Sequence, residues 1–183
     1  MNIQEKTQTQ TTKKVFYETD IDHEEEIDKI LEGAEELKFM PWSGLVQVSK
    51  FKKGDKVITY IRDQINNKVL LVEDDLEGII DKIFEKLEEG LSKYFPGLEG
   101  CQMYDREIEY YKEIEGGEAY EQFFTDIDIP ISMTNKEISV KTAKVWLLYN
   151  SDTQQYGLKV SVYYEDILPA LYDYIYSNYQ KAN

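Results

Sequence analysis

The chain has 183 residues, of which 42% are hydrophobic and 31% charged, and its formal net charge is −15. This composition is typical of a globular protein and excludes a disordered chain. No apolar run is long enough for a transmembrane helix, the polar stretch 1–14 lacks the hydrophobic region of a secretory signal, and the single Cys101 has no disulfide partner. We therefore expect a cytoplasmic protein with a disordered lead at 1–14 and one compact domain at 15–183.

The first predicted element is an amphipathic helix over residues 20–38. Its apolar stripe repeats at the helical period and consists of Ile27, Ile30, Leu31, Ala34 and Leu37. Acidic residues in its first turn suit the helix dipole, and Pro41 and Gly44 follow it. The apolar stripe predicts that one side of this helix is buried against the rest of the fold.

A strand meander and a second helix follow. Strand-like segments lie at 45–51, 57–62 and 69–72, and the turn Lys52-Lys53-Gly54-Asp55 predicts a hairpin between the first two. The helix is expected over 74–95, with Asp74 or Asp75 as its cap and Pro96-Gly97 as its stop. Its apolar face consists of Leu76, Ile79, Ile80, Ile83, Phe84, Leu87 and Leu91.

The second half of the chain predicts more strands and a third helix. The Glu- and Tyr-rich stretch 103–114 fits either a strand or a helix, and 126–131 alternates like a strand that Pro130 places at an edge or an end. Further strands are expected at 137–142, 144–149 and 156–164, before a helix from 165 to about 180 that tolerates Pro169 in its first turn.

These elements predict an α+β fold of antiparallel sheets with three amphipathic helices. The stretch 68–76 resembles 159–167, because each runs from a strand through an acidic pair into a helix. This similarity suggests a duplicated βββα unit, with sub-units at 15–98 and 99–183, although strand, acidic cap and helix also follow one another by chance.

The acidic residues are concentrated in three blocks. Residues 18–38 hold ten Asp and Glu against two Lys, 73–92 hold eight against two, and 105–128 hold nine against two basic residues. Residues 50–68 between the first two blocks have six Lys and Arg against two Asp. This distribution favours a binding face over an evenly solvated surface, although a solvated face is the simpler interpretation of any one block.

On a helix over 20–38 the acids recur every three or four residues, which corresponds to steps of roughly 6 Å along the axis. This pitch is of the order of the phosphate spacing of a DNA strand. Such a row of carboxylates would suit a basic nucleic-acid-binding groove, and tyrosines near the third block would add contact area. The predicted partner-binding residues are Glu24, Asp28, Glu32, Glu35, Glu36, Asp81, Glu85, Glu109, Tyr110 and Tyr111.

Catalysis is the weaker interpretation. One histidine, His23, and one cysteine exclude the usual Cys/His zinc site, and no Walker loop, Gly-x-Gly-x-x-Gly or Gly-x-Ser-x-Gly motif is present. No cofactor or metal is therefore expected. The enzyme alternative is a metal-dependent hydrolase with a carboxylate cluster around 105–128, which depends only on Asp126, Asp128 and nearby Glu residues.

In size, charge and lack of cofactor motifs the chain resembles the small acidic inhibitors that phages and mobile elements carry against restriction or CRISPR nucleases. The resemblance covers no alignable motif, so it transfers no functional residue. It implies an inhibitor that acts by nucleic-acid mimicry or groove occlusion on a basic partner such as a Cas or restriction nuclease, without binding nucleic acid or membrane itself. A toxin-neutralising immunity protein is an alternative with the same electrostatic logic.

Overall fold

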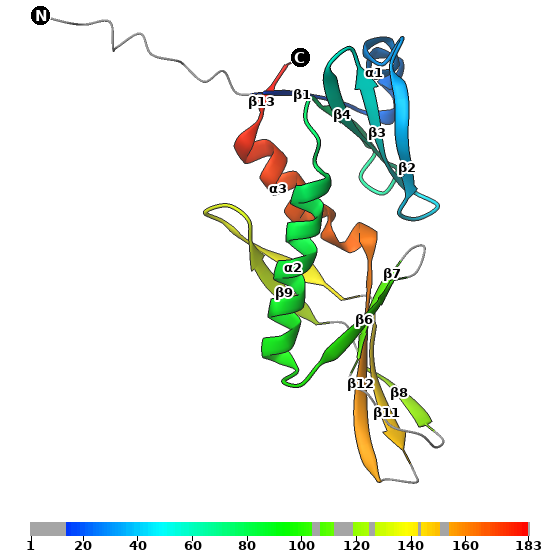
Figure 1. Cartoon of the computed structure of the whole chain (residues 1–183), viewed down its shortest axis with the longest axis vertical. Helices are drawn as coiled ribbons and strands as arrows, with labels where there is room; N and C mark the ends of the chain where they lie inside the picture. Colours follow the sequence, from blue (N-terminus) through cyan, green and yellow to red (C-terminus); the bar gives the residue numbers. More distant parts are fainter. Residues whose placement is uncertain are drawn as a thin grey trace, which may run out of the picture.

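The computed structural model describes residues 14–103, 107–111, 119–124, 127–142, 144–150 and 154–182. The fold is α+β, with a mixed six-strand sheet, a five-strand antiparallel sheet and a two-strand antiparallel sheet. Figure 1 shows an elongated molecule in which the six-strand sheet lies at one end of the long axis and the five-strand sheet at the other. Two long helices and the two-strand sheet lie between them.

The six-strand sheet has the order β13-β1-β5-β4-β3-β2, and only the β1–β13 pair is parallel. Its strands are β1 (Val15–Thr19), β2 (Glu35–Pro41), β3 (Val46–Lys53), β4 (Lys56–Asp63), β5 (Lys68–Val72) and β13 (Gln180–Lys181). The predicted β3–β4 hairpin is confirmed, with Gly54 in its turn at the positive φ of 61° that glycine tolerates best. Sequence patterns did not predict β1, β2 or β13.

Helices cover both faces of this sheet. Successive strand residues point to opposite faces, so Val69 and Leu71 of β5 lie under α1 (Glu25–Ile30) and join a cluster around Ile27. Leu70 and Val72 face the other way, into the main core, which contains α2 (Glu77–Tyr94) and α3 (Leu168–Asn178). The sheet is therefore the middle layer of three, with α1 on one face and α2 and α3 on the other.

The helix predicted over 20–38 is wrong in its second half. A 3-10 turn at Ile21–His23 leads into the six-residue α1, and residues 35–41 form β2 instead. Gly33 has φ of 80° in the intervening turn, a left-handed conformation that ends a helix. The apolar periodicity past Gly33 was therefore coincidental, and Leu37 is 46% exposed on a strand.

The second helix is confirmed, with α2 buried along Ile80, Ile83, Leu87 and Leu91. It begins at Glu77, and its N-cap residue is Leu76, so the predicted cap at Asp74 or Asp75 is wrong. The Asp75 carboxylate still accepts the Glu77 N–H at 3.1 Å. The helix packs against β9 (Asp128–Ser132), which pairs with β10 (Glu137–Lys141) in the two-strand sheet. Both strands of a two-strand sheet are edges, so the predicted edge position of Pro130 is confirmed.

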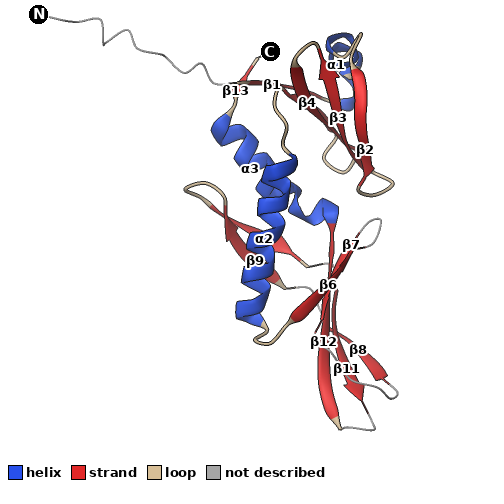
Figure 2. Cartoon of the chain, viewed as in Figure 1, coloured by secondary structure: helices blue, strands red, loops and turns tan. Residues whose placement is uncertain are grey.

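The five-strand sheet has the order β6-β7-β12-β11-β8 (Figure 2). Its strands are β6 (Glu99–Met103), β7 (Glu107–Tyr111), β8 (Ala119–Phe124), β11 (Lys144–Asn150) and β12 (Gln155–Tyr163). A 3-10 turn at Tyr164–Ile167 then leads into α3, with Pro169 in the first turn as predicted. Because β10 pairs with β9 in a separate sheet, the second half does not reproduce the β3–β4–β5 meander of the first.

One hydrophobic core joins the two predicted sub-units. It contains residues of the six-strand sheet and α2 together with Ile108, Ile129, Val160 and Leu171 from beyond residue 98. Residues 1–13 of the predicted disordered lead lie outside the described residues. Lys14 belongs to the fold, because its Nζ lies 3.0 Å from Asp74 Oδ1 and its carbonyl accepts a hydrogen bond from the Gln180 N–H.

An ion-pair cluster joins the start of α2 to the sheet and makes stability depend on pH. Glu77 binds Lys38 at 2.5 Å and Lys50 at 2.7 Å. The hydrogen bonds from Lys38 and then Lys50 lower the pKa of Glu77 to about 2. A lowered carboxyl pKa stabilises the fold above its unfolded value near 4.5, and this stabilisation disappears as the pH falls through about 2.

We expect Glu77→Gln to lower the free energy of unfolding by about 0.5–1 kcal/mol at pH 7, because the group is partly exposed and solvent screens the pairs. Glu88→Gln, which changes an exposed carboxylate on the same helix, is the control and should have almost no effect. Urea unfolding at pH 7, 5, 3 and 2 measures both. The difference between wild type and Glu77→Gln should shrink from pH 5 to pH 2, and a constant difference would contradict the assignment.

Candidate protein-interaction surface

The basic stretch 50–68 and nearby lysines neutralise the start of the second acidic block. Five of the six ion pairs among the described residues join this block to lysines, and the sixth joins Arg62 to Glu24. The five join Lys14 to Asp74, Lys38 to Glu77, Lys50 to Asp75 and Glu77, and Lys56 to Glu73. These acids tie the start of α2 to the sheet, so their charges are balanced by ion pairs within the molecule.

Most of the first acidic block has no ion-pair partner among the described residues, whereas Glu24 pairs with Arg62. Eight of its carboxylates are exposed, and none takes part in an ion pair with another described residue. They are Asp20, Asp22, Glu25, Glu26, Asp28, Glu32, Glu35 and Glu36, and we call them the α1 acidic surface. Only Lys29 opposes them within the segment 20–36. Lys53 also reaches the end of α1, where its Nζ donates to the Ile30 carbonyl at 2.6 Å, but the eight carboxylates outnumber these two lysines. A negative potential is therefore expected around α1.

The structure keeps the predicted residues of the first block together but changes their geometry. Asp28 lies on α1, Glu32 in the turn after it, and Glu35 and Glu36 at the start of β2. They form no single helical row, so the predicted match to the phosphate pitch of DNA is wrong. Glu24 is half-buried and holds Arg62 through a 2.8 Å bond from Nε, which raises the pKa of the guanidinium.

The other predicted residues do not join this surface. Asp81 and Glu85 are exposed on α2, which lies on the opposite face of the six-strand sheet from α1. Glu109 and Tyr110 lie on β7 in the five-strand sheet, toward the other end of the long axis from α1 (Figure 1). Tyr110 is only 2% exposed and cannot serve as a contact residue, and the side chain of Tyr111 lies outside the described residues.

Sequence analysis missed an apolar patch beside the acids. Leu37, Phe39 and Leu45 are 46%, 53% and 50% exposed, and we call them the β2 apolar patch. They are three of the six large hydrophobic residues that are exposed among the described residues, and they lie within nine positions of one another. The alternation of Leu37, Phe39 and Pro41 indicates a strand, but the helical interpretation of 20–38 concealed it.

The patch borders a small hollow on the α1 side of the sheet. Phe39 and Tyr60 both pair with Ser49, so Phe39 lies in the same cross-strand row as a residue packed near α1. The hollow has a volume of about 160 Å³ and is lined by Phe39, Pro41, Ser43, Gly44, Leu45, Val46, Gln47, Arg62 and Gln64. This is below the roughly 300 Å³ at which small-molecule pockets begin, so it suits one side chain of a protein better than a free ligand.

The local fold fixes both walls of this hollow. Ser43 Oγ accepts hydrogen bonds from the N–H groups of Leu45 and Val46, each at 3.0 Å, which holds the β2–β3 loop in a tight turn. Trp42 anchors that loop in the main core, because it is buried and its ring lies 6.2 Å from the ring of Tyr164. Arg62 forms part of the lining and also binds Glu24, which directly precedes Glu25 of the α1 acidic surface, so the hollow lies near that surface.

β2 is an outer strand of its sheet, but its edge is poorly suited to strand addition. Its pairing with β3 is irregular between Glu36 and Lys38, Lys38 is charged, and Pro41 has no N–H to donate. Bulges, lysines and prolines are features by which proteins prevent edge-to-edge pairing. A partner would therefore contact this region through side chains and not by extending the sheet.

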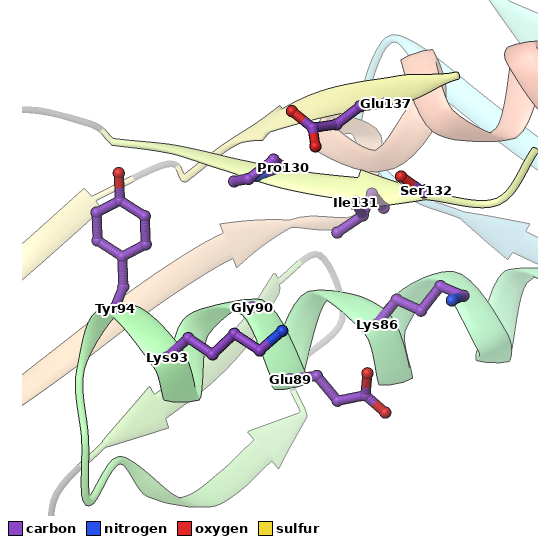
Figure 3. Close-up of a pocket in the computed structure, with 9 residues that line it drawn as sticks. All are labelled: Lys86, Glu89, Gly90, Lys93, Tyr94, Pro130, Ile131, Ser132 and Glu137. Carbon is purple, nitrogen blue, oxygen red and sulfur yellow. The ribbon is translucent and has the colours of Figure 1, made fainter. Parts of the chain in front are cut away.

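A second hollow, of about 380 Å³, lies between α2 and the β9–β10 sheet (Figure 3). Lys86, Glu89 and Lys93 border it from the helix and Glu137 from β10, so its lining combines both signs of charge.

Asp128, from the proposed hydrolase cluster, is exposed on β9, and Asp126 lies outside the described residues. No group of three His, Cys, Asp or Glu side chains in the described part of the chain is arranged to hold a metal ion.

Within the described residues, no helix combines the length and apolar character needed to cross a membrane. Comparisons with protein-family models, with curated proteins and with solved structures found no match. Functional inference for this chain therefore depends on its own surface, in which the α1 acidic surface and the β2 apolar patch adjoin.

Proposed function

We propose that the chain is an acidic inhibitor that binds a basic, nucleic-acid-binding protein in the cytoplasm through its α1 acidic surface. The observation that carries this proposal is the unequal compensation of charge. Lysines pair with the start of the second acidic block, whereas eight exposed carboxylates around α1 have no ion-pair partner among the described residues.

This arrangement costs the free protein stability and favours a basic partner. Neighbouring carboxylates repel one another, by a few tenths of a kcal/mol for each close pair on a helix. A basic protein that covers them would relieve this repulsion and would be drawn in by the negative potential. Nucleic acid would be repelled by the same potential, so the expected ligand is a protein.

Inhibition would follow from competition for one basic surface. Lys and Arg side chains that hold phosphates also bind carboxylates, so the inhibitor would occupy the groove that the partner uses for nucleic acid. The carboxylates come from a short helix, a turn and a strand, so the mimicry proposed here is of charge density and not of helical pitch. A guide-loaded CRISPR nuclease and a restriction endonuclease are the partners to test first.

The test is a charge-reversal triple variant, Glu25→Lys, Asp28→Lys and Glu32→Lys. We expect at least a tenfold loss of affinity for the nuclease that the wild type binds, because each reversal replaces an attraction with a repulsion. Asp81→Lys, Glu85→Lys and Glu88→Lys change the charge equally on the opposite side of the sheet and serve as the matched control. Binding by surface plasmon resonance at 50, 150 and 300 mM NaCl gives the affinities and their salt dependence.

Two outcomes would contradict the proposal. In one, the two triple variants lose equal affinity, which indicates a response to net charge alone. In the other, wild-type affinity stays constant across the salt series, which excludes an electrostatic mechanism. Absence of binding to either nuclease, with or without guide RNA, would exclude both proposed partners.

A further inference from the structure

We propose that the hollow at the β2 apolar patch receives one protruding apolar side chain from a basic segment of the partner. This inference rests on the proposed function, because it assigns the second contact of the same interface. Phe39 and Leu45 border the hollow, and each exposes about half of its surface, 53% and 50%, to solvent. Large apolar side chains that are exposed together are typical of interaction sites.

The hollow is an uncovered part of an otherwise covered sheet face. On this face α1 shields Ile58, Tyr60 and Leu71 of β4 and β5, which are all buried. Phe39 continues the row of Tyr60 onto β2, beyond the helix, and remains exposed. Pro41 and Gln47 continue the row of Arg62 in the same way. A partner side chain seated there would take the position that α1 occupies over the neighbouring strands.

The charges beside the hollow decide between its possible occupants. Glu35 and Glu36 precede the patch on the same strand, and Glu24 adjoins it through Arg62. A second copy of this chain, with a net charge of −15, would bring like charges together at this place. A strand added to the edge would meet the irregular pairing at Glu36 and Lys38 and the missing N–H of Pro41. A basic segment with one apolar side chain would be attracted by the carboxylates and would need no strand pairing at the edge of β2.

The two parts of the surface would then have different kinetic roles. Exposed carboxylates act at a distance and set the association rate and its dependence on salt. A desolvated apolar contact near the centre of an interface acts only once the partners touch, so it sets the dissociation rate. Changes at Phe39 should therefore shorten the lifetime of the complex without altering the salt dependence.

The probes for a direct test are two blocked nine-residue peptides. Each has four lysines and arginines on either side of its centre, which is phenylalanine in one peptide and glycine in the other. We expect the phenylalanine peptide to bind at least fivefold more tightly in an NMR titration at 150 mM NaCl. Its largest shifts should lie at the amides of Leu45, Gln47 and Gln64, which line the hollow.

Phe39→Ser should abolish the difference between the peptides. Ile65→Ser removes an apolar side chain of similar exposure, 50%, from the β4–β5 turn, and should leave the difference intact. Circular dichroism is needed to check that both variants fold. Equal affinity of the two peptides, or a difference that survives Phe39→Ser, would overturn the assignment of the hollow.

Sedimentation velocity tests the competing occupant. A wild-type dimer that Phe39→Ser dissociates would assign the patch to a second copy and overturn the proposal.

The nuclease experiment separates this inference from the proposed function. If Phe39→Ser inhibits and binds like the wild type while the acidic triple variant does not, this inference fails and the proposed function stands. If the peptides behave as expected but no nuclease is bound, the proposed function fails and the hollow keeps its assignment.

Discussion

Replacing Asp63 with alanine is expected to lower the free energy of unfolding by about 3 to 4 kcal/mol, because four donors, among them the buried Tyr172 hydroxyl, then lose a charged acceptor. Asp63 is 0% exposed. Its Oδ1 accepts the N–H groups of Ile65 and Asn66 at 2.9 and 3.0 Å, and its Oδ2 accepts Asn66 Nδ2 at 2.7 Å and Tyr172 Oη at 2.6 Å. One carboxylate thus holds the β4–β5 turn and ties α3 to it.

A second variant measures the contribution of the bond to α3, and a third serves as the control. Tyr172→Phe removes one of the four donors and should cost about 1 to 1.5 kcal/mol. Burial, and then the hydrogen bond to Asp63, raises the pKa of Tyr172 well above its ordinary value. The phenol therefore stays protonated at pH 7 and donates to Asp63. Asp55→Ala, at an exposed aspartate of the β3–β4 turn, is the control for losing a turn carboxylate. Urea unfolding at pH 7 that gives equal losses for Asp63→Ala and Asp55→Ala would refute the structural role of Asp63.

The second large effect is expected at Gly90, where α2 packs closely against β9. A Cβ at this position would lie 2.5 Å from Cγ2 of Ile129, a fully buried, β-branched residue with little freedom to move. We expect Gly90→Ala to lower the free energy of unfolding by about 2 to 3 kcal/mol, although alanine is the better helix former, because the helix and the strand must separate.

Gly78→Ala, near the start of the same helix, is the matched control. A Cβ there meets nothing within 4 Å, so the substitution should raise the free energy of unfolding by about 0.5 to 1 kcal/mol through helix propensity alone. The two variants make the same chemical change on one helix with opposite expected signs. Thermal and urea unfolding measure both, and a stabilising Gly90→Ala would show that α2 does not contact β9 as described.

Elements that depend on local sequence were predicted well. The β3–β4 hairpin follows from one glycine turn, and α2 follows from an apolar stripe that continues over the whole helix. The 20–38 segment shows the limit of periodicity, because Ala34 and Leu37 continue the stripe of α1 by chance. Gly33 was the residue that could have corrected this, since its position directly after an apolar stripe is typical of a helix end.

Which acids are free could not be predicted from sequence spacing. The lysines that neutralise Asp74 and Glu77 lie far away along the chain, at positions 14, 38 and 50, and only the fold brings them to the start of α2. The blocks around α1 and α2 have similar composition, yet the described lysines pair with the four acids at the start of the second block and with none of the eight carboxylates of the α1 acidic surface. The β2 apolar patch was missed for a related reason. Leu37 fits the buried stripe of a predicted helix over 20–38, but it lies exposed on β2 in the fold.

The pairing of β13 with β1 has a consequence for the order in which the fold assembles. Val15 pairs with Gln180, and Phe16 with Lys181, so this parallel pair joins residues that lie 165 positions apart along the chain. Strands β2 to β5 pair with their neighbours in sequence and can form a local meander first. Contacts between distant segments form slowly. The β1–β13 pair should therefore form late in refolding, and pulsed hydrogen exchange should show protection of the β3 and β4 amides before that of Gln180.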